Sequence, residues 1–165
     1  MADEAATYIA DTSALIEIQR KYPIDVFKSL WTNLSELAQN DKIIAPKLVF
    51  EEINRYARED YLKTWATQHK KIFKDTTPAH ILKVKEILKQ FPKLIDAASE
   101  YEQADPYVIA LACCTEPQSK LFENVRVVVT EESFTKENKI PFVCNKLGIQ
   151  CLNTLAFFRQ EGWKF

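Results

Sequence analysis

One stretch of the sequence predicts the fold of the chain: Thr7-Tyr8-Ile9-Ala10-Asp11-Thr12-Ser13-Ala14-Leu15-Ile16. A short apolar strand runs directly into an acid, two hydroxyl residues and the apolar start of a helix. Strands of a parallel α/β sheet deliver functional groups from their carboxyl ends, and Asp11 follows such an end. Taken alone, Asp11 also suits a helix N-cap, and Thr12 and Ser13 can satisfy free N–H groups of the helix.

The composition indicates one globular domain. The 165 residues are 47% apolar and 27% charged, with a net charge of −1, an ordinary balance for a folded domain. No apolar run approaches the roughly 18 residues of a membrane helix, and no leader pattern precedes the first strand. We therefore expect a single domain over residues 1–165, cytoplasmic and without membrane contact. The net charge argues against a uniformly basic nucleic-acid binder, although an acidic site and a basic face can cancel.

Scarce residue types exclude several catalytic classes. With only Gly148 and Gly162 as glycines, the chain has neither a dinucleotide-binding fingerprint nor a P-loop. The two histidines, His69 and His80, lie in lysine-rich stretches, which gives little support to a histidine zinc site or a Ser-His-Asp triad. Chemistry must therefore rest on carboxylates. The cysteines form no CxxC pair and are expected to be small core residues: Cys113, Cys114, Cys144 and Cys151.

Strands and helices are expected to alternate along the chain. The β-branched run at 125–129 has the composition of a strand buried on both faces. The alternation predicts an α/β domain of three α/β/α layers, with a mostly parallel sheet of about four to five strands. The expected strands are 7–10, 42–45, 125–129 and 149–152, and the expected helices are 14–20, 25–37, 47–57, two between 59 and 90, 107–115, 137–147 and 155–159.

Acidic residues recur where these strands end or where the following helices begin. Because crossover connections are right-handed and parallel strand ends gather at one edge, we expect these positions to converge. They are Asp11, Glu51-Glu52, Asp105 and Glu131-Glu132.

Two of the positions offer a choice of glutamate. We expect Glu52 to face inward, because it directly precedes the apolar Ile53, and Glu51 to be solvated. In the second pair we expect Glu132, rather than Glu131, to face inward.

Crowded carboxylates repel one another and raise their own pKa values, and a bound cation removes that penalty. Oxygen ligands without His or Cys suit Mg²⁺ or Mn²⁺, which can activate a water for attack on a phosphodiester. Ser13 and Thr130 are expected to orient a carboxylate or a water. The predicted metal ligands and catalytic residues are Asp11, Glu52, Asp105 and Glu132. Asp105, which precedes a proline, also suits a plain helix cap.

Four segments carry a resemblance to PIN domains. Ile9-Ala10-Asp11-Thr12-Ser13-Ala14-Leu15 looks like their opening motif, and Leu48-Val49-Phe50-Glu51-Glu52-Ile53 is similar to their second acidic motif. Ala104-Asp105-Pro106-Tyr107-Val108-Ile109-Ala110 resembles the third, and Val128-Val129-Thr130-Glu131-Glu132-Ser133-Phe134 the fourth. The resemblance runs from Tyr8 to about Phe158, and the ending 157–165 resembles one prokaryotic single-domain PIN subfamily.

The resemblance implies a PIN fold and a metal-dependent endoribonuclease. Many small members, of the VapC type, are toxins of type II toxin–antitoxin pairs that cut RNA with Mg²⁺ or Mn²⁺. They often form homodimers and are held inactive by an antitoxin protein. In this chain Asp11, Glu52 and Asp105 match the metal acids, and Ser13 and Thr130 match the hydroxyl positions. The fourth motif departs from the family pattern, because it carries glutamates where aspartate is usual; the identity of the fourth ligand and the binding of a second metal therefore stay open.

Two other functions stay open at this point. A HAD-type phosphatase would use Asp11 as nucleophile, but it needs an aspartate where Ser13 stands. A non-catalytic PIN-like module that binds RNA or protein would have no need of the acidic positions.

The expected substrate is single-stranded or tRNA-like RNA. Lysines near Tyr61, Trp65 and Phe73, and a second set ending at Lys93, offer phosphate and base contacts. The lysines equally suit solvated helix faces, and the aromatic residues equally suit the core. An early apolar group of Ile16, Phe27 and Trp31 suits either the core or a dimer surface.

Overall fold

The strands form one parallel sheet in the computed structural model, which describes residues 6–58, 61–113 and 125–165. The sheet is five-stranded with the order β3-β2-β1-β4-β5, and every neighbouring pair is parallel. The predicted α/β class with a parallel sheet is therefore confirmed. The strands are β1 (Thr7–Ala10), β2 (Ile43–Pro46), β3 (Phe73–Lys74), β4 (Arg126–Val129) and β5 (Cys151–Leu152).

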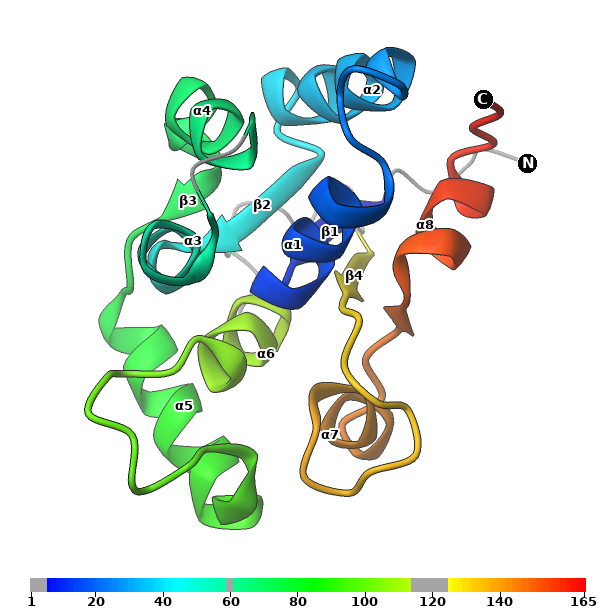
Figure 1. Cartoon of the computed structure of the whole chain (residues 1–165). Helices are drawn as coiled ribbons and strands as arrows, with labels where there is room; N and C mark the ends of the chain where they lie inside the picture. The colour runs from blue at the N-terminus through cyan, green and yellow to red at the C-terminus, as the bar shows by residue number, and fades with distance from the viewer. Residues whose placement is uncertain (1–5, 59–60, 114–124) are drawn as a thin grey trace.

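Helices cover both faces of this sheet (Figure 1). On one face lie α1 (Thr12–Lys21), α2 (Lys28–Gln39), α3 (Lys47–Tyr56), α4 (Tyr61–Gln68) and α8 (Thr154–Gln160). On the other face α6 (Asp105–Cys113) lies against β1, β2 and β4, between α5 (Pro78–Gln90) and α7 (Ile140–Lys146). Two short 3₁₀ turns, η1 (Lys70–Ile72) and η2 (Pro92–Leu94), complete the connections. This is the expected arrangement of three layers.

The chain winds in two directions from the centre of the sheet. From β1 it steps outward to β2 and β3, and it then returns to place β4 on the other side of β1. The strand order therefore reverses between β1 and β4, which is where α/β sheets open a crevice at the carboxyl ends of their strands. Asp11 and Thr130 directly follow these two strands.

The core lies around the two central strands and under the early helices. Ile9, Val127 and Val128 are completely buried, as expected for strands covered on both faces. Trp31 is also buried, and Ile16 and Phe27 pack against the core. The early apolar group is therefore part of the core.

Two expected helix starts were wrong, and one strand was not predicted. Helix α2 begins at Lys28 instead of Asp25, because the amides of Val26 and Phe27 bond back to Pro23 in a turn that leaves Val26 exposed. Helix α7 begins at Ile140 instead of Glu137, with Pro141 in its first turn, where a missing N–H costs nothing. The two-residue edge strand β3 was not predicted, because two residues are too few to show the alternation of apolar and polar side chains that indicates a strand.

The sequence also predicts a helix start at Thr77-Pro78 and a helix end at Gly148, and both predictions were confirmed. Thr77 caps α5 and accepts a hydrogen bond from the His80 amide at 3.2 Å. Gly148 follows α7 with a φ of +70°, a conformation that glycine adopts without strain. Cys144 is buried, whereas Cys114 and the expected end of the 107–115 helix at Thr115 lie outside the described residues.

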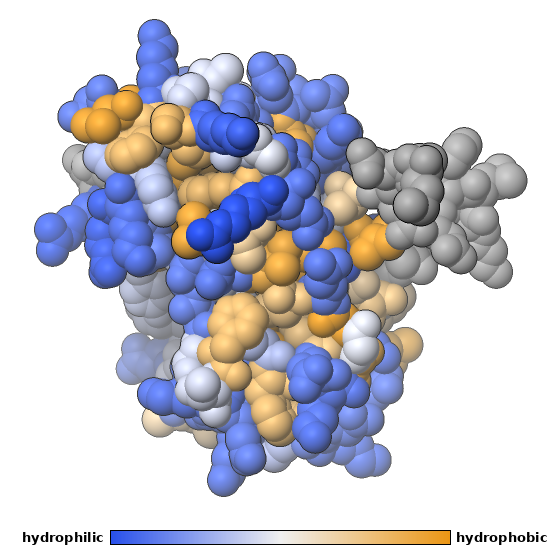
Figure 2. Space-filling model, turned by 90° about the vertical axis from the view of Figure 1, so that its right-hand side faces the viewer, coloured by the Kyte–Doolittle hydropathy of each residue, from blue (hydrophilic) through white to orange (hydrophobic). Residues whose placement is uncertain are grey.

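The side of the molecule that carries β5, α7 and α8 is shown in Figure 2, where apolar side chains gather among polar ones. Large exposed apolar side chains in this part of the chain include Phe134, Leu155 and Phe165. The edge strand β5 has only two residues, which leaves little free backbone for pairing with another sheet. Within the described part of the chain, no helix has both the length and the apolar character to cross a membrane.

Candidate active site

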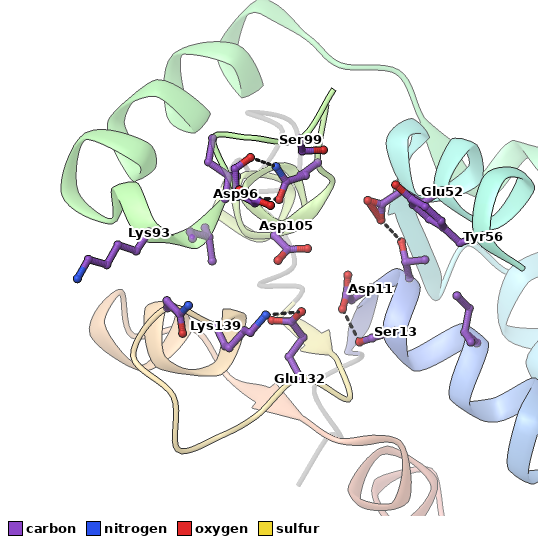
Figure 3. A pocket seen from close by; sticks show the side chains of 16 residues that line it. Asp11, Ser13, Glu52, Tyr56, Lys93, Asp96, Ser99, Asp105, Glu132 and Lys139 are labelled. Atoms are coloured by element: carbon purple, nitrogen blue, oxygen red, sulfur yellow. Dashed lines mark hydrogen bonds and ion pairs between the residues drawn. The ribbon is translucent and has the colours of Figure 1, made fainter. Parts of the chain in front are cut away.

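A pocket of about 590 Å³ opens at the carboxyl edge of the sheet, beside the point where the strand order reverses. Figure 3 shows Asp11, Asp105 and Glu132 pointing toward this opening, with Glu52 at its side. The chain supplies them from separate places: the end of β1, helix α3, the first residue of α6 and the loop after β4. All four predicted carboxylates therefore line one pocket.

Each glutamate pair divides as expected. Glu52 lines the pocket, whereas Glu51 is exposed and lines a different hollow on α3 with Lys47. Glu132 lines the pocket, whereas the Glu131 carboxylate accepts hydrogen bonds from the backbone amide of Thr154, at 2.8 Å, and from its hydroxyl. Glu131 thus holds the start of α8 against the loop after β4.

Two hydroxyls orient the carboxylate of Asp11. Ser13 Oγ donates to Asp11 Oδ2 at 2.6 Å, and Thr130 Oγ1 donates to the same oxygen at 2.8 Å. Each hydroxyl oxygen in turn accepts a backbone N–H, from Glu131 at 3.0 Å for Ser13 and from Glu132 at 3.1 Å for Thr130. The two hydroxyl oxygens lie 3.1 Å apart, and because an ionised carboxylate can only accept, Asp11 Oδ2 takes a proton from each of them. Asp11 stands at the N-cap position of α1 but makes no side-chain cap hydrogen bond.

Thr12 has a role at the site that the sequence did not indicate. Its hydroxyl donates to Glu52 Oε1 at 2.6 Å, while the Ala104 amide donates to Glu52 Oε2 at 3.2 Å. Glu52 thereby connects α1, α3 and the residue before α6. In the sequence, the only indication of this role is the position of Thr12 next to Asp11. A hydroxyl at that position suits a helix cap equally well.

The pocket is strongly acidic. Burial raises the pKa values of Asp11, Glu52 and Glu132 above their usual range. Burial, together with the nearby charges of Asp11, Glu132 and Glu52, raises the pKa of Asp105 to about 8. Two cations oppose this effect: Lys139 Nζ is 3.7 Å from Glu132 Oε1, and the charge of Arg55 favours the ionised form of Glu52. Lys93 also lines the pocket, but Figure 3 shows it extending away from the carboxylates.

The residues present fit a divalent cation, although their side chains are not gathered around one point. Among the described residues, no group of three or more His, Cys, Asp or Glu is arranged as a ready metal site. Within the same residues, Glu132 Oε2 is buried without a hydrogen-bond partner. Buried unpaired carboxylate oxygens are costly, and a hard cation satisfies them. The all-oxygen donor set suits Mg²⁺ or Mn²⁺.

The repulsion within the pocket gives a first prediction. The unfolded chain loses the Asp105 proton above about pH 4, whereas the folded protein retains it up to about pH 8. Metal-free stability therefore falls as pH rises across this window, and Asp105→Asn avoids the loss. At about pH 7 in EDTA we expect Asp105→Asn to raise the free energy of unfolding by about 1–2 kcal/mol and the Tm by ~2–6 °C.

Thermal unfolding followed by circular dichroism, at about pH 5 and about pH 7, measures this difference. The gap between the two proteins should widen at the higher pH. Asp75→Asn is the control, because that side chain is 89% exposed and should change little. A variant less stable than the original at the higher pH would contradict the expected repulsion.

The model of the family described as "Domain of unknown function (DUF4411)" matches residues 8–165, so the chain belongs to this family. The matched region contains every carboxylate of the pocket. No curated protein and no solved structure matches the sequence.

Proposed function

We propose that the protein is a metal-dependent endoribonuclease that hydrolyses RNA phosphodiester bonds. The observation that carries the proposal is the convergence of four carboxylates from separate segments on one pocket, with an unpaired buried oxygen on Glu132. A purely structural role would not require so many buried carboxylates, since burial makes each of them costly to ionise.

In this proposal Asp11, Glu52, Asp105 and Glu132 hold Mg²⁺ or Mn²⁺. The cation would act as a Lewis acid on the phosphodiester and lower the pKa of an attacking water. Ser13 and Thr130 keep Asp11 in one orientation through their bonds to Oδ2. Lys139, which lines the same pocket, is placed to neutralise a phosphate oxygen.

The resemblance to PIN domains extends the proposal. The acidic motifs follow one another in the PIN order, and the parallel sheet with helices on both faces agrees with that fold. On this basis the protein acts in the cytoplasm as the toxin of a type II toxin–antitoxin pair, as a homodimer with an antitoxin protein as partner.

The test is cleavage of a labelled pool of single-stranded RNAs in Mn²⁺, in Mg²⁺ and in EDTA. We expect cutting that requires the metal and that Glu52→Gln lowers by about 100-fold. The matched control is Glu51→Gln, which alters the neighbouring exposed carboxylate and should cut like the original protein. A rise in Tm with Mn²⁺, absent in Glu52→Gln, reports metal binding independently of cleavage.

The outcomes separate the possible functions. Metal binding without cleavage of the pool would narrow the substrate to a structured RNA such as a tRNA. Absence of both metal binding and cleavage would overturn the proposal and favour a non-catalytic binding module.

A further inference from the structure

A second hollow adjoins the carboxylate pocket. It has a volume of about 420 Å³ and is lined by Ile16, Gln19, Arg20, Tyr56, Arg58 and Leu62. Ile16 and Tyr56 line both hollows, so the two share a wall formed by α1 and the end of α3. Figure 3 shows Tyr56 beside Glu52, at the edge of the carboxylate pocket.

The side chains of this hollow differ in kind from those of the acidic pocket. Tyr56 leaves 59% of its surface exposed, and the guanidinium carbon of Arg55 lies 5.6 Å from the centroid of its ring. Arg20 and Arg58 are both exposed and bring guanidinium groups to the rim. Arg20 also pairs with Glu17 at 3.2 Å, on the side of α1 that carries Lys21. Tyr56 offers a flat ring on which a base can stack, and Arg20 and Arg58 offer cations for phosphate.

Gln19 points to a ligand independently of these charges. Its Oε1 is buried and has no hydrogen-bond partner among the described residues. A buried acceptor without a donor is costly, and native proteins normally satisfy such groups. Gln19 lines the hollow, and a turn of its amide toward that space would bring Oε1 to an N–H group of a ligand seated there, as when an amide side chain reads the edge of an unpaired nucleobase.

We propose that this hollow binds one nucleotide of a single-stranded RNA, next to the phosphate that enters the carboxylate pocket. The base stacks on Tyr56 and donates an N–H to Gln19, and Arg58 contacts the adjoining phosphate. Aromatic stacking combined with a positive rim is the recognition mode of single-stranded nucleic acids. This inference rests on the proposed function, because it makes the hollow a subsite of the same RNA.

The test measures binding of a short labelled single-stranded RNA by fluorescence anisotropy in EDTA, where no metal-dependent cutting occurs. We expect Tyr56→Leu to weaken the Kd by about fivefold or more. Arg58→Gln should reduce the slope of log Kd against log salt by about 0.7, the value for one lost phosphate contact on a single strand. Gln19→Leu should change the relative affinities for RNAs of different base composition.

Matched controls use the same substitutions elsewhere. Tyr101→Leu alters another tyrosine that is 50% exposed, and Arg159→Gln alters an exposed arginine of α8. Neither residue lines the hollow, and both variants should bind RNA as the original protein does. Retention of the Mn²⁺-dependent rise in Tm by Tyr56→Leu would show that the carboxylate pocket is intact.

The subsite and the proposed activity can fail separately. RNA binding and KM that are unchanged in Tyr56→Leu and Arg58→Gln would overturn the subsite, even if the protein cuts RNA. Tyr56-dependent RNA binding without cleavage would support the subsite and count against the hydrolytic activity. Equally tight binding of a free nucleoside monophosphate would overturn the RNA assignment in favour of a mononucleotide site.

Discussion

Asp11→Asn should lower metal-dependent RNA cleavage at least about 100-fold, since it removes the most buried charge in the pocket. Asp11 is 2% exposed, and two hydroxyls, one after β1 and one after β4, donate to its Oδ2. The asparagine carbonyl can still accept both hydrogen bonds, so the fold around the site should persist. What disappears is the negative charge that a divalent cation needs.

Single-turnover cleavage rates in Mn²⁺ measure this effect without interference from product release. Asp25→Asn is the matched control, because Asp25 is exposed and lies away from the pocket lining. The Asp11→Asn protein should also lose most of its Mn²⁺-dependent rise in Tm. Cleavage that stays within about threefold of the original rate would show that Asp11 is not a metal ligand in the reaction.

Trp65→Ala should destabilise the protein by about 3–5 kcal/mol and lower the Tm by ~10 °C. Trp65 has no exposed surface, and its indole N–H donates to Ser35 Oγ at 3.0 Å. Its ring meets the edge of Trp31, with centroids 6.0 Å apart, and so joins α4 to α2. The substitution leaves a large cavity and an unpaired hydroxyl at this junction.

Urea unfolding followed by tryptophan fluorescence or circular dichroism measures the change in free energy of unfolding. Trp65→Phe is the control, because it retains most of the ring and should cost less than half as much. A loss below about 1 kcal/mol for Trp65→Ala would show that the early helices repack around the gap. Since α4 packs against α1 and α3, these helices also hold Asp11 and Glu52 in place.

Local patterns predicted most of the elements. The run 125–129 indicated a buried strand, Thr77-Pro78 indicated a helix start, and Gly148 indicated a helix end, because each signal acts over a few neighbouring residues. The acids at strand ends were recognised for the same reason. Right-handed crossovers then bring the ends of parallel strands to one edge, so their convergence was predictable in outline.

The sequence by itself determined that the chain alternates strand and helix and that its possible chemistry rests on carboxylates. Only the tertiary structure decided that Thr12 donates to Glu52 and that Phe73–Lys74 extend the sheet. It also decided that Gln19 and Tyr56 share a hollow beside the carboxylates. Local propensity depends on adjacent residues, whereas the rotation of α3 and the seating of an edge strand depend on packing between segments far apart in the sequence.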